Sequence, residues 1–291
     1  MPNWVPFACL SITSVFLLSY ILVKKKEKAP KIILFWLFIS GLAYLFEFVI
    51  FILLNSYEYY PEFFSSHYND SIAGSIISQA LAVPVAITLI VVFHLRFRWI
   101  FFIIGLFFLI ETFFLYLDIY EHNWWKSIYT ILFLSLTVML SKVWWRYLYS
   151  GKYHYINFVT LYFAIMTLSQ TIGWILSSLL GLYELPIGLF SIEIKDNVIG
   201  NGVYLFFTTY LYTLIIYYRY NDLPYTVMTL VFLLTIEIFM VNQGILFLKE
   251  PYYIFILPSL HIAFIQGGKF VCHRHFPGFH QTSQKRLLRQ E

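Results

Sequence analysis

Three acidic residues lie inside long apolar stretches of the chain. Glu47 and Glu111 end two copies of one pattern, GLAYLFE at 41–47 and GLFFLIE at 105–111, and Glu237 lies in a third apolar stretch. An ionised carboxylate near the centre of a bilayer costs about 3 kcal/mol, so such residues usually face other protein groups or a water-filled cavity. The three glutamates are therefore predicted to line an outward-facing polar pocket that binds a cation, a cationic solute or a proton.

Other polar residues of the apolar stretches are predicted to contribute to the same site. Asp118 follows Glu111 by seven residues, which is two helical turns, so both lie on nearly the same helix face. The remaining candidates for substrate or ion binding are Gln170, Asn242 and His261. A structural interpretation stays open, because a protonated glutamate also stabilises a helix bundle by hydrogen bonding across it.

The composition is that of a membrane protein. Of the 291 residues, 60% are hydrophobic and only 12% are charged, and the mean hydropathy is +0.74. A soluble domain carries about 25% charged residues. Apolar stretches of 18 or more residues recur, and each is long enough to cross a hydrocarbon core of about 30 Å. These features predict an all-α, polytopic transmembrane helical bundle.

Nine spans are predicted, separated by charged or turn-forming segments such as KKKEKAPK and RYNDLP. Their ranges are 4–23, 32–54, 72–93, 99–117, 127–145, 156–179, 201–218, 225–247 and 252–268. With the amino terminus outside, 16 of the 19 Lys and Arg residues fall in cytoplasmic segments. Basic loops stay in the cytoplasm, so the amino terminus is predicted outside and the carboxyl terminus in the cytoplasm.

The predicted organisation is one transmembrane domain, residues 1–268, followed by a basic cytoplasmic tail, residues 269–291. The two GLxxLxE patterns also indicate a duplicated helical hairpin, in which spans one and two correspond to spans three and four.

A membrane-embedded enzyme for lipid or envelope substrates is the first alternative function. Acidic and histidine residues follow the second and fourth spans, and together they would form an acid–base or metal group: His67, Asp70, Asp118, Glu121 and His122. Nucleotide-binding, zinc-protease and serine-hydrolase motifs are absent from the sequence. A non-catalytic membrane sensor or complex component is the second alternative.

The stretch from NSYEYYPEFF through HYNDSIAGSII to ETFFLYLDIYEHNWWKS resembles small, uncharacterised multi-pass membrane proteins of spore-forming Bacilli and Clostridia. The resemblance covers roughly residues 40–150, and it rests on size, span count and a vocabulary rich in Phe, Ile, Tyr and Lys. It implies an integral protein of a bacterial cell membrane. It assigns a role to no residue.

The sequence thus predicts a membrane protein that binds or transports a cation or cationic small solute, with or without proton coupling. Its expected partners are membrane lipids and that solute, and no nucleic acid, cofactor or metal is expected. The sequence fixes neither the oligomeric state nor the identity of the solute.

Overall fold

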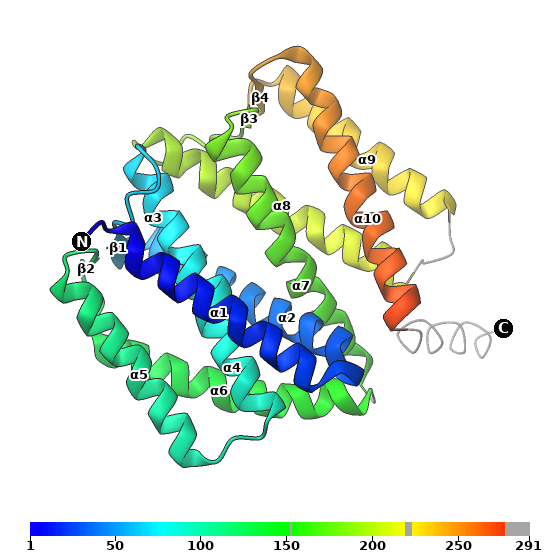
Figure 1. Ribbon diagram of the computed structural model, residues 1–291. Helices are drawn as coiled ribbons and strands as arrows, with labels where there is room; N and C mark the ends of the chain where they lie inside the picture. The colour runs from blue at the N-terminus through cyan, green and yellow to red at the C-terminus, as the bar shows by residue number, and fades with distance from the viewer. Residues whose placement is uncertain (152, 219–222, 277–291) are drawn as a thin grey trace. The chain divides into compact units, whose positions relative to one another are not determined.

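The computed structural model describes residues 1–151, 153–218 and 223–276 (Figure 1). Within these ranges, nine helices are long and apolar enough to cross a membrane, and the only strands are four short ones. The chain divides into two compact units, residues 1–152 and 153–291, which we call unit 1 and unit 2. The protein is therefore an all-α, nine-span integral membrane protein, as predicted.

Unit 1 contains five of the nine candidate spans, and some of these combine an α-helical segment with a π-helical segment. Its elements are α1 (Trp4–Lys24), η1 (Lys26–Lys28), α2 (Ala29–Glu47), η2 (Phe48–Leu53), β1 (Tyr57–Tyr59), α3 (His67–Ser75), η3 (Ile76–Ala82), α4 (Val83–Val92), α5 (Phe97–Tyr116), β2 (Tyr120–His122) and α6 (Ser127–Ser150). Here η2 and η3 are π-helical. The segment formed by η3 and α4 packs against both α1 and α2.

Unit 2 contains the other four spans. Its elements are α7 (His154–Trp174), η4 (Ile175–Leu179), β3 (Tyr183–Glu184), α8 (Glu193–Tyr218), α9 (Leu223–Asn242), β4 (Phe247–Leu248), η5 (Pro251–Phe255) and α10 (Ile256–His275). Here η4 is π-helical and η5 is a 3-10 helix. The helix α8 packs against α7, α9 and α10. Figure 1 shows α9 and α10 side by side.

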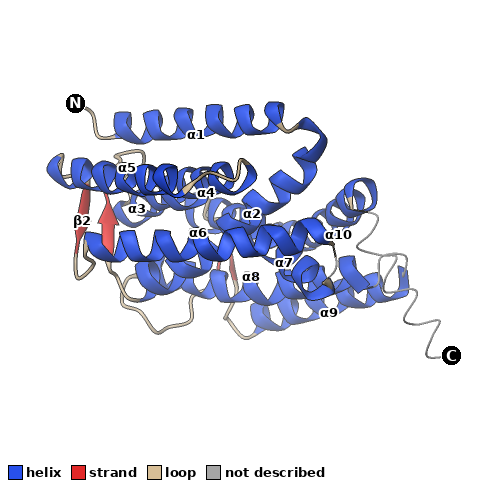
Figure 2. Cartoon of the chain, turned by 90° about the horizontal axis from the view of Figure 1, so that it is seen from below, coloured by secondary structure: helices blue, strands red, loops and turns tan. Residues whose placement is uncertain are grey.

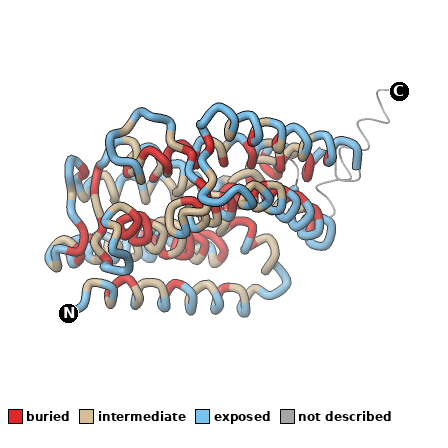
Figure 3. Tube along the Cα trace, turned by 90° about the horizontal axis from the view of Figure 1, so that it is seen from above, coloured by how far each residue is buried: buried red, intermediate tan, exposed pale blue. Residues whose placement is uncertain are grey.

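Apolar side chains remain exposed on several helices, which is expected of surfaces that contact lipid. On α5 the exposed residues include Phe97, Phe101 and Tyr116, and on α9 they include Met228 and Phe239. Figure 3 shows buried and exposed positions alternating along the helices. Figure 2 shows how little of the chain is strand. Apolar residues can stay exposed on these helices because lipid tails solvate them as well as a protein core does.

Two helices begin earlier than predicted, because an aspartate lies in their first turn. The third span starts at His67 instead of 72, and the seventh starts at Glu193 instead of 201. The aspartates, Asp70 and Asp196, are buried, although the sequence suggested solvated loop positions. At the other end, α9 stops at Asn242 instead of 247 and α10 continues to His275 instead of 268. The predicted tail thus begins inside α10, and its residues 277–291 lie outside the described residues.

Each buried aspartate binds the loop that precedes its helix. The carboxylate of Asp70 accepts backbone N–H bonds from Glu62, Phe63 and Phe64, at 2.8, 2.6 and 3.0 Å. The carboxylate of Asp196 accepts the corresponding bonds from residues 188, 189 and 190, at 2.7, 2.9 and 3.0 Å. Hydrogen bonds to a carboxylate are stronger than neutral ones, so these contacts fix the entry of the chain into α3 and α8.

The aspartate contacts belong to an internal repeat with a constant offset of 126 residues, the difference between 57 and 183. In unit 1 Tyr57 of β1 is the strand partner of His122 of β2, and in unit 2 the corresponding residues, Tyr183 of β3 and Leu248 of β4, are partners in the same way. By the same offset α5 corresponds to α9, and the span from His67 to Val92 corresponds to α8. Left-handed backbone also recurs: Asn55, Glu62 and Asp118 have positive φ where unit 2 has Gly181, Gly188 and Gly244. Unit 2 therefore repeats the fold of residues 29–150, and α1 lies outside the repeat.

This repeat has a different frame from the predicted hairpin duplication. In the structure α2 corresponds to α7, so the counterpart of Glu47 is Gly173 and the counterpart of Glu111 is Glu237. The GLxxLxE match between 41–47 and 105–111 joins helices that are not counterparts in the 126-residue repeat, and the hairpin duplication within unit 1 stays a prediction. Short matches are common where a few apolar residue types dominate both segments.

Candidate functional site

Unit 2 contains a buried pair of ionisable side chains. Glu237 lies on α9 and His261 on α10, and the His261 Nε2 atom is 2.7 Å from Glu237 Oε1. Their side chains are 1% and 3% exposed. The sequence predicted both as site residues, and the structure brings them together. Two ionisable groups this deeply buried are held in place only if they pair with each other and are hydrogen-bonded.

Two tyrosines of α8 complete the group around His261. The Tyr204 hydroxyl donates to Glu237 Oε1 at 2.5 Å, and the Tyr212 hydroxyl lies 2.5 Å from His261 Nδ1. Both imidazole nitrogens are therefore engaged. If the ring is neutral, Nε2–H donates to the carboxylate and Nδ1 accepts from Tyr212; if it is protonated, both nitrogens donate.

The second carboxylate oxygen of Glu237 has a different environment. Glu237 Oε2 is buried, and no described residue of the protein bonds to it. Buried polar atoms are nearly always hydrogen-bonded, and leaving one unpaired costs about 1–3 kcal/mol. This oxygen is thus an acceptor suited to an N–H or O–H donor that does not come from the described protein.

Unit 1 pairs the corresponding glutamate with a histidine from another element. The His122 Nε2 atom, from β2, lies 3.0 Å from Glu111 Oε1 on α5. The histidine side chain is 18% exposed, so this pair has more contact with solvent than the pair in unit 2. An acid and a histidine thus pair in both units, and the pair in unit 1 is the more exposed to solvent.

Glu47 has no charged partner among the described residues. Its carboxylate accepts hydrogen bonds from the Tyr57 hydroxyl of β1 and from Ser75 Oγ of α3, the latter at 2.7 Å. Burial, and then the charge of Glu47, raises the pKa of Tyr57 well above its usual value. The Tyr57 hydroxyl therefore stays protonated at neutral pH and remains available as a donor.

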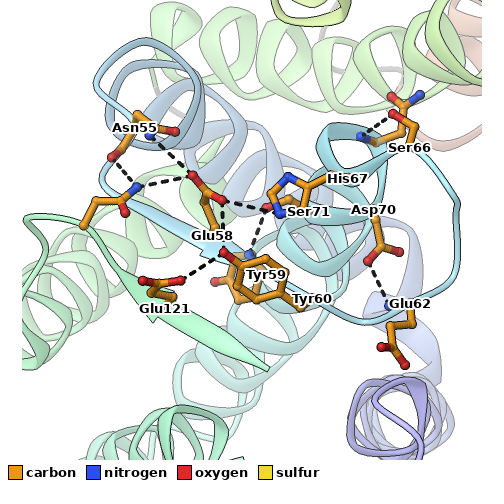
Figure 4. A network of polar contacts seen from close by, with 12 residues as sticks. Asn55, Glu58, Tyr59, Tyr60, Glu62, Ser66, His67, Asp70, Ser71 and Glu121 are labelled. Atoms are coloured by element: carbon orange, nitrogen blue, oxygen red, sulfur yellow. Dashed lines mark hydrogen bonds and ion pairs between the residues drawn. The ribbon is translucent and has the colours of Figure 1, made fainter. Parts of the chain in front are cut away.

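A polar network covers the outer surface of the β1–β2 hairpin (Figure 4). The Tyr60 hydroxyl lies 3.1 Å from Glu58 Oε2 and 3.0 Å from Glu121 Oε2, and these two glutamates face each other across the strands. Glu58 has further contacts at 3.4–3.5 Å with Asn55, Asn123 and His67. Partial burial, followed by the contacts with the two glutamates, raises the pKa of Tyr60. Like charges opposite each other destabilise a hairpin, so these donors stabilise it.

Three other predicted site residues have structural positions. Asp118 is exposed in the turn after α5, with φ 54°, where unit 2 has a glycine. The Gln170 amide donates to the Gly202 carbonyl at 2.9 Å and so joins α7 to α8. Asn242 is exposed and ends α9. None of the three has a contact with Glu237 or His261 among the recorded interactions of the described residues.

The residues that the enzyme alternative requires have separate structural roles and do not form one group. Asp70 binds three backbone amides, His122 pairs with Glu111, and Asp118 lies in a turn. His67 contacts Glu58 and Glu121 contacts Tyr60, while Figure 4 shows Asp70 bonded separately to Glu62.

The predicted shared pocket required Glu47, Glu111 and Glu237 to converge. The structure gives each glutamate partners within its own unit, and Glu237 belongs to a different unit from the other two. Convergence of the three stays a prediction. Sequence reasoning missed the tyrosines Tyr57, Tyr204 and Tyr212. A signal existed for Tyr57 alone, in the YE pair that precedes the buried aspartate in both units, Tyr57-Glu58 and Tyr183-Glu184.

Comparisons with protein-family models, with curated protein sequences and with solved structures find no match to this chain. The site must therefore be interpreted from its own chemistry.

Proposed function

We propose that this integral membrane protein binds, and carries across a bacterial cell membrane, a small cationic solute that has N–H donors. The observation that carries the proposal is the buried Glu237–His261 pair with its unbonded oxygen, Glu237 Oε2. Ionisable groups inside membrane helices are rare, and they mark ion or substrate pathways more often than structural contacts.

A protonated amine supplies the hydrogen-bond donor that Glu237 Oε2 lacks. An ammonium group would donate an N–H bond to Glu237 Oε2 and would offset the carboxylate charge. The Glu237–His261 pair can also hold a proton on either partner, because a carboxylate and an imidazole nitrogen both accept one. Proton coupling is therefore part of the proposal.

The contacts of His261 weigh against the enzyme alternative at this site. A general base needs a nitrogen that is free to take a proton from the substrate, and both nitrogens of His261 are engaged by Glu237 and Tyr212. The sensor alternative predicts no flux at all, so the flux experiment separates it from transport.

The experiment compares two cations in vesicles that contain the purified full-length protein. Methylammonium has N–H donors, and tetramethylammonium carries the same charge without them. We expect saturable uptake of methylammonium, little binding of tetramethylammonium, and at least a tenfold loss of uptake in Glu237→Gln.

Glu184→Gln is the matched control, because Glu184 is an exposed carboxylate of the same unit. It is expected to transport like the unaltered protein. Equal uptake by Glu237→Gln and the unaltered protein, or equal handling of the two cations, would overturn the proposal.

A further inference from the structure

The two units hold one corresponding tyrosine in two different ways. Tyr57 and Tyr183 occupy the same position in β1 and β3, and both are 2% exposed. In unit 2 the Tyr183 hydroxyl donates to Asn201 Oδ1 at 3.0 Å. In unit 1 the Tyr57 hydroxyl donates to the carboxylate of Glu47. The same backbone therefore satisfies this hydroxyl with a neutral amide in one unit and with an acid in the other.

Unit 2 shows that the fold does not need the acid. The counterpart of Glu47 is Gly173, and a Cβ atom at Gly173 would collide with the Leu205 side chain and lie 3.1 Å from Asn201 Nδ2. The amide and leucine fill the space that the glutamate side chain takes in unit 1. A carboxyl group buried in a membrane helix costs stability that an amide avoids, so a structural role alone explains its presence poorly.

The partners of Glu47 suit a group that changes its protonation state. A hydroxyl both donates and accepts, unlike an ammonium or a backbone N–H. When Glu47 is ionised, Tyr57 and Ser75 both donate to it. When Glu47 carries a proton, its own O–H can donate to one of these oxygens, and only a hydroxyl hydrogen has to rotate. Neither state leaves a buried group unpaired.

π-Helical segments lie on both sides of this carboxyl group. Glu47 is the last residue of α2 and η2 follows it directly, while Ser75 is the last residue of α3 and η3 follows it directly. The counterpart of η2 in unit 2 is the π-helical η4, so that segment is common to both units. The counterpart of η3 is part of the regular helix α8, so the π-helical turn after Ser75 is specific to unit 1. π-Helical turns are rare and occur frequently at functional sites, so this irregularity is a second, independent sign at the same place.

Other ionisable groups of unit 1 face the same cluster. Burial, together with the charges of Glu47 and Glu111, raises the pKa of Tyr59 and of Tyr120. The two tyrosine rings stack with centroids 4.7 Å apart, and Tyr59 also meets Ser78 at 3.1 Å. Tyr59 and Tyr120 thus lie within electrostatic reach of both Glu47 and Glu111, and the Tyr120 ring centroid is 5.0 Å from that of His122.

We propose that Glu47 is a proton-exchange site of unit 1, which takes up one proton on its carboxylate and releases it through the neighbouring tyrosine hydroxyls toward Glu111 and His122. One O–H bond forms on Glu47 as one breaks on the donor, so no other reactant is needed. The assignment concerns unit 1 alone and does not depend on the amine site of unit 2.

Infrared difference spectroscopy of the full-length protein in lipid nanodiscs tests the assignment without a transported ligand. A protonated carboxyl group has a C=O stretching band that a carboxylate lacks. We expect the unaltered protein to show such a band that disappears as the pH is raised. The band should be absent from Glu47→Gln at every pH and should persist in Glu237→Gln.

A second variant, in which residues of unit 2 replace their counterparts in unit 1, tests the assignment even if Glu47→Gln fails to fold. The triple variant Glu47→Gly, Ser75→Asn, Gln79→Leu gives unit 1 the residues that unit 2 has at 173, 201 and 205. It should keep the helical circular dichroism spectrum and lose the titrating band. A band that survives in both Glu47 variants would overturn the assignment, and so would a Glu47 band of constant intensity across the titration.

Discussion

Glu111 in unit 1 and Glu237 in unit 2 occupy corresponding positions on α5 and α9, and each pairs with a histidine. His122 comes from a strand and is 18% exposed, whereas His261 comes from a helix and is 3% exposed. By the repeat offset, the residues at those two places in the other unit are Leu248 and Ser135. The acid thus has the same position in both units, and the element that supplies the histidine determines how far the pair is exposed to solvent.

The same comparison at Glu47 shows the reverse. There the tyrosine is kept and the acid changes, to Gly173 with Asn201 beside it. The loop-binding aspartates Asp70 and Asp196 change in neither unit. The aspartates that bind the preceding loop recur in both copies of the fold, whereas Glu47 and the histidine partners of Glu111 and Glu237 differ between them.

The largest expected effect comes from breaking the drier pair. His261→Leu should lower the free energy of unfolding by about 3–5 kcal/mol, because it leaves a buried carboxylate with no ionisable partner and only the Tyr204 hydroxyl as donor. His122→Leu should lower it by about 1 kcal/mol, because the His122 side chain is 18% exposed and this pair is less desolvated than the pair in unit 2. Thermal unfolding in detergent, followed by circular dichroism, measures both losses. Equal losses would remove the distinction between the two pairs.

The aspartates should show the opposite result, a matched effect in both units. Asp70→Asn and Asp196→Asn each keep one acceptor oxygen and lose the charge that strengthens three backbone bonds. We expect a loss of about 2–3 kcal/mol from each, since bonds to charged groups contribute more than neutral ones. The same unfolding assay serves here. A loss in one unit only would mean that the shared contacts do not stabilise both copies alike.

The next largest loss in the free energy of unfolding is expected at two corresponding glycines. A Cβ atom at Gly74 would lie 2.5 Å from Tyr59 Cβ, and at Gly200 it would collide with the Leu185 carbonyl oxygen. Alanine at either position should cost about 1–3 kcal/mol, with the greater loss at Gly200, where backbone must move. Gly105→Ala is the control, because no atom lies within 4 Å of its added Cβ. A greater loss at Gly105 than at Gly200 would contradict the packing described for α8.

The smallest effect concerns the left-handed turn after α5 and α9. Asp118 has φ 54° and Gly244 has φ 64°. Asp118→Gly should change the free energy of unfolding by less than about 0.5 kcal/mol, while Gly244→Ala should lower it by about 1 kcal/mol, the steric cost of this conformation. A larger effect of Asp118→Gly on unfolding would contradict the purely steric role of this turn, and loss of methylammonium uptake would support Asp118 as a site residue.

The helical membrane fold followed from the sequence because long apolar runs have few other solutions in lipid. The starts of two spans were predicted late because Asp70 and Asp196 resemble loop residues, and only three-dimensional contacts with the preceding loop explain their burial. Glu237 and His261 were recognisable as buried polar residues, but their pairing joins different helices, and no local pattern encodes that contact.

The repeat escaped sequence reasoning for a related reason. Its most informative identities are few and widely separated, namely Tyr57 with Tyr183, Asp70 with Asp196, Gly74 with Gly200 and Glu111 with Glu237. Between them, one apolar residue replaces another with little physical consequence. Those four shared residues hold the common fold in place, and the apolar residues between them differ between the two units.

The Tyr60 hydroxyl lies between Glu58 and Glu121 but carries a single hydrogen. It can donate to only one of the two carboxylates at a time. Glu58 has Asn55, Asn123 and His67 to replace it, whereas no such side chain reaches Glu121 in the part of the chain that the structure describes. We therefore expect Glu121, which is also the more exposed of the two, to react faster with water-soluble carbodiimides and so to accept a label while Glu58 keeps its other contacts.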